Sequence, residues 1–228
     1  MSEWWTYSLS DFLLFSPRTY YRLFELYNEA IWPAQLIGLA AGLVVLVLLV
    51  WPTRWRGWCV AAILAGCWLW VATFYHWQHY ATINWAADYF GYAFALEALL
   101  LSWTGGILDR LRFRRIADPD GAAGFSLAGF AIVIYPLIGP LLGRPWTQVE
   151  IFGVAPDPTV LATLAVLVAA ERAHWPLLVL PLCWCAVSGA TLWTMASPDW
   201  PIMPLAGAIA MALTVWKSLA RRSSEPLV

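Results

Sequence analysis

Charge is scarce in this chain, and lysine occurs only once. Asp, Glu, Lys and Arg together make up 12% of the 228 residues, and 61% are hydrophobic, whereas a soluble domain carries roughly 25% charged residues. The one lysine, Lys217, lies at the end of the last apolar stretch. A retinal needs a lysine deep inside that helix, so we do not expect a rhodopsin. The net charge of −1 gives no sign of a nucleic-acid partner.

Several catalytic signatures are also missing. The chain has no Walker A sequence and no G-x-S-x-G motif, which excludes the usual nucleotide-binding loop and the hydrolase nucleophile elbow. Its three histidines cannot place two haem ligands at one depth on two helices. The four cysteines all lie in apolar stretches, where disulfides are not expected. The start of the chain lacks a basic n-region, so we expect no cleaved signal peptide. A non-catalytic role is favoured over an enzyme.

Long apolar stretches are what the chain has in abundance. A hydrocarbon core ~30 Å thick needs ~20 apolar residues in a helix. Seven stretches approach this length, and the fifth is short: Trp32–Val50, Trp58–Trp77, Trp85–Trp103, Gly124–Leu142, Pro158–Ala170, Trp175–Trp193 and Pro201–Trp216. The pattern predicts an all-α polytopic membrane bundle of about seven spans.

The basic residues predict the orientation of this bundle. If seven spans alternate, ten of the thirteen basic residues fall on the side of the C-terminus, and only Arg18, Arg22 and Arg144 fall on the other. Basic loops stay in the cytoplasm. We therefore expect an outer N-terminus, a cytoplasmic C-terminus and a multi-pass protein of a bacterial inner membrane.

The same pattern predicts one membrane domain over residues 1–228. Its expected parts are an outer interfacial segment (1–31), spans one to three (32–104), a basic cytoplasmic linker (105–123), span four (124–142), an outer loop (143–157), spans five to seven (158–217) and a cytoplasmic tail (218–228).

The segment before the first span predicts an amphipathic helix at the outer interface. Ser16 and Pro17 are typical of an N-cap followed by the first helical position. Apolar residues then recur at helical spacing, and Pro33 is expected to bend the chain. Within span four, Pro136 and Pro140 predict a broken or kinked helix.

A faint internal repeat relates spans two and six. Residues 67–75 read CWLWVATFY, and residues 185–193 read CAVSGATLW. Spans one to three and five to seven would then be parallel repeats joined by span four, as occurs in transporters. This three-plus-one-plus-three order is similar to that of the SWEET sugar transporters. Their Pro-Gln signature is missing here, where Pro33-Ala34-Gln35 stands.

Glu97 is the most informative single residue, because it is predicted to lie near the middle of span three. A carboxylate inside the membrane is rare and indicates a functional site by default. Glu97 could bind and release a proton there. The alternative is a protonated side chain that donates to a neighbouring carbonyl or hydroxyl group.

Two histidines at the outer end of span two suggest a second site. His76 and His79 are spaced i, i+3 and so share a helix face, and Asp88 begins the next span. Imidazoles with a carboxylate can hold a divalent metal. The spacing lacks the i, i+4 pair and adjacent Glu of a zinc protease, and interfacial hydrogen bonding is the alternative.

The run from Phe152 to Thr159 is the strongest local motif. Asp157 is predicted to be the N-cap of span five, with Pro158 at its first position. Together with Glu150, this outer segment could also form one wall of a ligand pocket.

Four stretches carry a resemblance to a known family: residues 15–20 (FSPRTY), 27–33 (YNEAIWP), 76–84 and 152–159. The chain resembles a bacterial membrane family that is catalogued as domain of unknown function 6064. The resemblance covers nearly the whole length and implies a multi-span inner-membrane protein, but no activity and no catalytic residue.

Three functions remain open from the sequence. The first is a small-solute or ion permease with a site between Glu97 and the His76, His79 and Asp88 cluster. The second is a non-catalytic subunit of a larger membrane complex, and the third is a membrane-embedded metalloenzyme. The expected partners are the lipid bilayer and either a second copy or a membrane complex.

Overall fold

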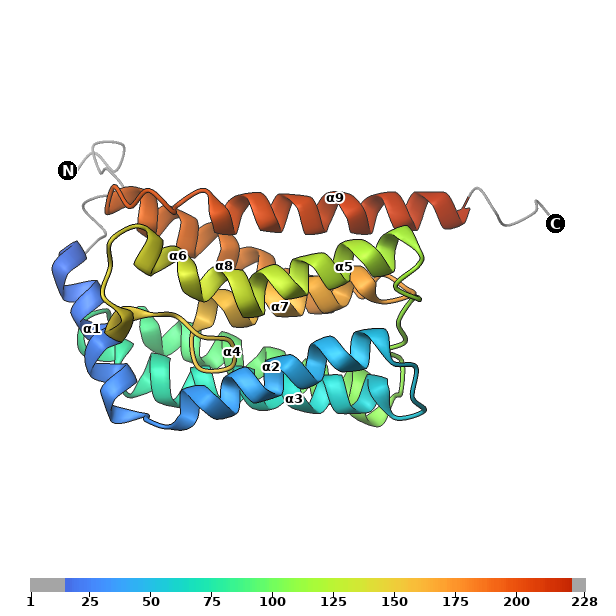
Figure 1. The fold of residues 1–228 in the computed structure, drawn as a ribbon, viewed down its shortest axis with the longest axis horizontal. Helices are drawn as coiled ribbons and strands as arrows, with labels where there is room; N and C mark the ends of the chain where they lie inside the picture. The colour runs from blue at the N-terminus through green and yellow to red at the C-terminus, as the bar shows by residue number, and fades with distance from the viewer. Residues whose placement is uncertain (1–14, 223–228) are drawn as a thin grey trace, which may run out of the picture.

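The computed structural model describes residues 15–222 and shows a bundle of helices. Helix accounts for 76% of the described residues, and no strand is formed among them. The long helices lie side by side along the molecule, and α1 crosses one end of them (Figure 1). The predicted all-helical architecture is confirmed. The predictions for residues 1–14 and 223–228 lie outside the described residues.

Several helices are interrupted by short wider or tighter turns. The elements are α1 (Pro17–Ala30), α2 (Ala34–Val50), α3 (Arg56–Trp70) with the π-helix η3 (Val71–Trp77), η4 (Tyr80–Thr82), α4 (Ala87–Leu101) with η5 (Ser102–Ile107), α5 (Pro119–Gly129) with η6 (Phe130–Ile134) and α6 (Tyr135–Leu141), η7 (Trp146–Gln148), α7 (Pro156–Ala169), α8 (Trp175–Thr194) and α9 (Ile202–Arg222).

Five helices in the described part are long and apolar enough to cross a membrane. They cover Arg56–Thr82, Ala87–Ile107, Pro119–Leu141, Trp175–Thr194 and Ile202–Ala220. A sixth is counted if α1 and α2, which meet at 91°, form one bent span. At 14 residues, α7 is shorter than a full span. The chain therefore has the spans of a membrane protein, while the count of seven stays a prediction.

The predicted start of α1 is confirmed. The Ser16 Oγ accepts a hydrogen bond from the Thr19 N–H at 3.2 Å, and Pro17 takes the first turn. One face of α1 is buried, through Tyr20, Leu23, Phe24 and Tyr27. These side chains pack on the end of the bundle, which explains why the helix turns away from α2.

Span four is not broken, and the alternative of a kink at its prolines stays a prediction. The helix begins at Pro119 and continues to Leu141, through both Pro136 and Pro140. The wider turn η6 lies directly before Pro136, and the Tyr135 N–H there bonds back to the Phe130 carbonyl. A π turn of this kind changes the register of backbone hydrogen bonds, so the chain accommodates the missing proline N–H without a break.

Helix α7 is enclosed by the rest of the bundle. All of its 14 residues are buried. Helix α5 approaches it at Gly124, where an added Cβ would lie 2.6 Å from the Cβ of Ala169. Helix α2, by contrast, has large exposed apolar side chains such as Ile37 and Val47. The first and fifth predicted spans thus have different surroundings, and the proposed repeat stays a prediction.

The C-terminus of α7 is capped by the single lysine of the chain. The Lys217 ammonium donates to the carbonyls of Val168 and Ala170 at 2.7 Å each and of Leu167 at 3.2 Å. Lys217 is 3% exposed. A cation at this position satisfies the last carbonyls of the helix and matches its macrodipole.

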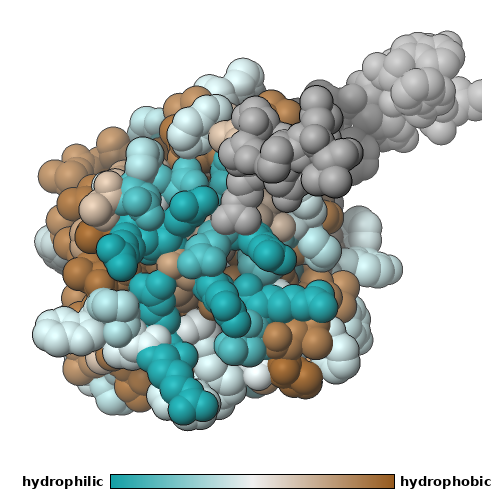
Figure 2. Space-filling model, turned by 90° about the vertical axis from the view of Figure 1, so that its right-hand side faces the viewer, coloured by the Kyte–Doolittle hydropathy of each residue, from teal (hydrophilic) through white to brown (hydrophobic). Residues whose placement is uncertain are grey.

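The two ends of the bundle differ in their charges. We call "basic end" the end formed by residues 51–55, 108–118, 170–174 and the C-terminus of α9. Hydrophilic side chains gather across this end and are surrounded by hydrophobic ones (Figure 2). We call "carboxylate end" the opposite end, formed by α1 and by residues 143–155 and 195–201.

Candidate functional site at the carboxylate end

The segment before α7 inserts into the bundle from the carboxylate end. Phe152, Val154 and Ala155 are buried. Gly38 of α2 leaves no room for a Cβ, which would collide with the Phe152 carbonyl oxygen. Gly153 has a φ of +84°, a conformation that favours glycine. This close approach lets a non-helical segment reach the interior and places the start of α7 there.

Helix α1 holds this segment in place. The Tyr27 hydroxyl donates to the Val154 carbonyl at 2.7 Å. The Asn28 side-chain amide donates to the carbonyls of Thr147 and Val149 at 2.9 Å each. The polar backbone of residues 147–154 therefore finds partners on α1, which covers this end of the bundle (Figure 1).

Asp157 forms the central polar contact of the site. Its carboxylate accepts from the Trp184 Nε1 and the Ser188 Oγ at 2.7 Å each, and from the Tyr135 hydroxyl at 3.0 Å. The prediction that Asp157 is the N-cap is wrong, because the helix begins at Pro156 and its N-cap is Ala155. Asp157 instead lies in the first turn, where its charge still suits the helix dipole.

A second network lies close to the first. The Arg144 guanidinium forms an ion pair with Asp199 at 2.5 Å and lies 4.7 Å from the centre of the Tyr21 ring. The Ser197 hydroxyl contacts Asp199 at 2.5 Å and the Tyr21 hydroxyl at 2.7 Å. These contacts join α1 to the segments before α7 and before α9.

Glu150 lies under the influence of both networks. It is 8% exposed, and its Oε2 atom is buried with no hydrogen-bond partner in the described part of the chain. Burial and the negative charge of Asp157 raise the pKa of Glu150 well above its usual range, against the opposing effect of Arg144. Glu150 therefore holds a proton to higher pH than an exposed glutamate does.

The structure separates the residues of the predicted metal site. His76 is fully buried among aromatic rings, with Phe94 at 4.5 Å and Trp184 at 5.1 Å between ring centres. His79 instead contacts the Tyr27 ring at 5.0 Å and the Phe74 carbonyl at 2.7 Å. Asp88 is exposed. Among the described residues, no three His, Cys, Asp or Glu side chains are grouped so as to hold a metal ion.

Glu97 lies inside the bundle, as predicted from its position in the third span. Its side chain is fully buried, and neither carboxyl oxygen has a hydrogen-bond partner among the described residues. Both ring nitrogens of His76 are also buried without a hydrogen-bond partner among the described residues. Buried polar groups without partners are uncommon and need a physical explanation.

The sequence interpretation missed the hydrogen-bond partners of Asp157. It identified Glu150 and Asp157 as neighbours on one segment, but not Tyr135, Trp184 or Ser188. Trp184 and Ser188 are spaced i, i+4 on α8 and so share a face. A tryptophan and a serine at this spacing are the one local signal that could have drawn attention to the contact.

Comparison with known proteins gives the family. Residues 18–225 match the model of a family of unknown function, DUF6064. The chain belongs to the DUF6064 family. The resemblance noted in the sequence is thereby confirmed. No curated protein and no solved structure matches this DUF6064 protein.

Proposed function

We propose that this DUF6064 protein is an ion permease of the bacterial inner membrane that conducts protons and small cations. The observation that carries the proposal is a series of buried ionisable side chains, Glu150, His76 and Glu97, with polar atoms that have no hydrogen-bond partner in the described residues. Such groups are costly inside a membrane protein and are typical of proton and ion pathways. A pathway along which protons move between these groups would explain why they are buried without partners.

These groups follow one another through contacts. Glu150 and Asp157 interact electrostatically. The Trp184 indole donates to Asp157 and packs against the His76 ring. Phe94, which contacts His76, lies three residues before Glu97 on α4. The series leads from the carboxylate end toward the middle of α4.

The charge at the carboxylate end favours a cationic solute. Asp157 and Asp199 provide two carboxylates against the one guanidinium of Arg144, and Glu150 adds a third negative charge when it releases its proton. A site with excess negative potential attracts cations and suppresses anions. In this conformation α1 covers the site through Tyr27 and Asn28, so entry of a solute requires α1 to move.

A proton flux assay tests the proposal. Proteoliposomes containing pyranine would be given a potassium diffusion potential with valinomycin, and the internal pH would be followed. We expect the wild-type protein to acidify the lumen faster than empty liposomes do, and Glu97→Gln to abolish the difference. Asp88→Asn, an exposed carboxylate on the same helix, should keep the wild-type rate.

The orientation is part of the same proposal. Basic loops favour the cytoplasm, so we infer that the basic end is cytoplasmic and that the carboxylate end faces outward. A green fluorescent protein fused after residue 228 should be fluorescent, because that protein folds only in the cytoplasm. A dark fusion, with an active periplasmic phosphatase fusion at the same point, would reverse the orientation.

The enclosure of α7 favours a second candidate function, an accessory subunit of a membrane complex. Every residue of α7 is buried, as expected of a solid core. A wild-type proton flux equal to that of empty liposomes would overturn the permease and leave this candidate. The metalloenzyme of the sequence analysis lacks a group of three ligands in residues 15–220, and we do not propose it further.

A further inference from the structure

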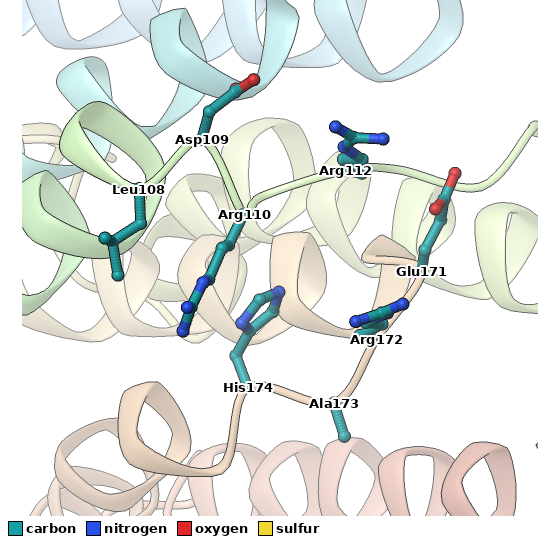
Figure 3. Close-up of a pocket in the computed structure, with 8 residues that line it drawn as sticks. All are labelled: Leu108, Asp109, Arg110, Arg112, Glu171, Arg172, Ala173 and His174. Atoms are coloured by element: carbon teal, nitrogen blue, oxygen red, sulfur yellow. The ribbon is translucent and has the colours of Figure 1, made fainter.

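A hollow of about 700 Å³ opens at the basic end, away from the carboxylate end. It lies between two loops, residues 108–112 and 171–174 (Figure 3). Arg110, Arg112, Arg172 and His174 are among the side chains that line it. Four of the eight lining residues thus have basic side chains.

The backbone presents these arginines in a fixed arrangement. Leu111 and Phe113 are buried in the bundle, whereas Arg110 and Arg112 alternate with them and are exposed. The two loops are joined by backbone hydrogen bonds, from Glu171 N–H to the Arg112 carbonyl at 2.7 Å and from Arg114 N–H to the Ala169 carbonyl at 2.9 Å. The arginines therefore stand on an anchored strand-like segment.

The arginines of the hollow outnumber its carboxylates and are not paired with them. In the described part of the chain, none of Arg110, Arg112 and Arg172 forms an ion pair with a carboxylate. Asp109 and Glu171 also line the hollow. Figure 3 shows the Arg110 side chain extending toward His174, whereas the Asp109 carboxylate points away from His174.

His174 and the start of α8 add to the attraction for an anion. The Nε2 atom of His174 is buried and has no hydrogen-bond partner in the described residues. Helix α8 begins at the next residue, Trp175, with His174 as its N-cap, and helix N-termini attract anions. Burial and the positive charges of Lys217, Arg110 and Arg172 lower the pKa of His174, and a bound anion would raise that pKa by offsetting the positive charges.

We propose that this hollow binds the phosphate group of an anionic lipid headgroup. Guanidinium groups match phosphate in geometry and charge. Apolar side chains at the same end favour a lipid over a soluble phosphate as the source, because Ile107 is 68% exposed and Trp175 is 44% exposed. Basic pockets between membrane helices bind phospholipid headgroups in this way.

Native mass spectrometry of the purified full chain tests this proposal. The protein would be delipidated and offered phosphatidylglycerol or phosphatidylcholine at equal concentration. We expect at least tenfold tighter binding of phosphatidylglycerol, and loss of most of that preference in the double variant Arg110→Gln/Arg172→Gln. The double variant Arg110→Lys/Arg172→Lys should restore part of it, because the charge is kept.

Two controls separate the site from general surface charge. Arg54→Gln removes an exposed arginine at the same end that does not line the hollow, and it should bind phosphatidylglycerol as the wild type does. His174→Ala should weaken binding without removal of a permanent charge. Circular dichroism of each variant checks that the helices are intact.

Three results would overturn the proposal. Equal binding of the two lipids would remove the headgroup preference. A glutamine double variant that binds like Arg54→Gln would move the site elsewhere. Displacement of phosphatidylglycerol by millimolar glycerol phosphate would show that the hollow takes a soluble phosphate, and the lipid would be the wrong source.

Discussion

At the carboxylate end, Asp157, Glu150 and Asp199 are buried beneath α1, whereas at the basic end Arg110, Arg112 and Arg172 stand exposed on loops. The buried carboxyl groups need partners inside the protein, because water cannot solvate them. The exposed guanidinium groups are solvated and need none. Charge therefore organises the interior at one end, and at the other it is available to bind a ligand.

Helix α7 runs between the two ends, and the charged groups at both of its termini are buried, like those of the carboxylate end. Asp157 lies in its first turn, and Lys217 caps its last carbonyls. Both charges are buried, and each lies where the helix macrodipole favours it. Lys217 thus lies at the basic end but is buried, unlike the arginines of that end.

Replacement of Asp157 should have the largest effect on stability. Asp157→Ala leaves the donors of Tyr135, Trp184 and Ser188 without an acceptor, which should lower the free energy of unfolding by about 4 kcal/mol. Asp88→Ala, at an exposed site, should change it by less than about 0.5 kcal/mol. Unfolding in detergent micelles measures both, and equal effects would remove the distinction between buried and exposed carboxylates.

Loss of the Lys217 cap should be the next largest effect. Lys217→Met keeps most of the volume but leaves the carbonyls of Leu167, Val168 and Ala170 without the ammonium, at a cost of about 3 kcal/mol. The control Arg54→Met removes an exposed charge from the same end and should be nearly neutral. If both variants unfold at the same temperature, the hydrogen bonds of Lys217 to the end of α7 do not stabilise the protein.

Two glycines of α5 test the packing around α7. Gly124→Ala would place a Cβ 2.6 Å from the Cβ of Ala169 and 2.7 Å from the Ala165 carbonyl oxygen, and should destabilise the protein by about 2 kcal/mol. Gly129 has nothing within 4 Å of such a Cβ. Gly129→Ala should therefore stabilise α5 by about 0.5 kcal/mol through helix propensity. A reversed order of melting temperatures would contradict the close contact.

Glu150 should make stability depend on pH. Because its pKa is raised by burial and by Asp157, the folded protein keeps the proton at pH values where the unfolded chain has released it. Its stabilising effect is complete below the ordinary glutamate pKa of about 4.3 and is lost as the pH rises toward the raised value. Glu150→Gln should flatten this decline in unfolding experiments across that range; an unchanged slope would assign the decline to other groups.

Replacement of a lining arginine should have the smallest effect on stability. Arg112→Gln changes an exposed side chain without an ion pair in the described residues, so we expect a change within about 0.5 kcal/mol. The same variant should weaken the binding of phosphatidylglycerol. A large loss of stability would place Arg112 with the buried charges and weaken the contrast between the two ends.

Local features of the fold were predictable because they depend on neighbouring residues. Ser16 and Pro17 start α1 as expected, since a cap involves atoms three residues apart. The same reasoning failed for Asp157, which stands one position past the helix start at Pro156. Two prolines flank Asp157, and either could have been the first helical residue.

The candidate site was predictable only in part. Glu97, Glu150 and Asp157 are buried in the structure, and the sequence identified all three as unusual. It also grouped Asp88 with His76, although Asp88 is exposed and His76 is enclosed by aromatic rings. Nearness along the chain does not fix the direction of a side chain, and the wider turn of η3 changes the facing of residues that follow it.

The amino-acid sequence alone was enough to predict a bundle of apolar helices with its basic loops gathered at one end. Those properties depend on span length and on the order of the loops. The packing of the helices was needed to establish that α7 is the enclosed helix, that Asp157 binds Ser188 and that Lys217 binds the Val168 carbonyl. The spans are apolar around their whole circumference, so their composition does not say which face meets which neighbour. The helices found their partners through side-chain packing and through the hydrogen bonds that the few buried polar groups require.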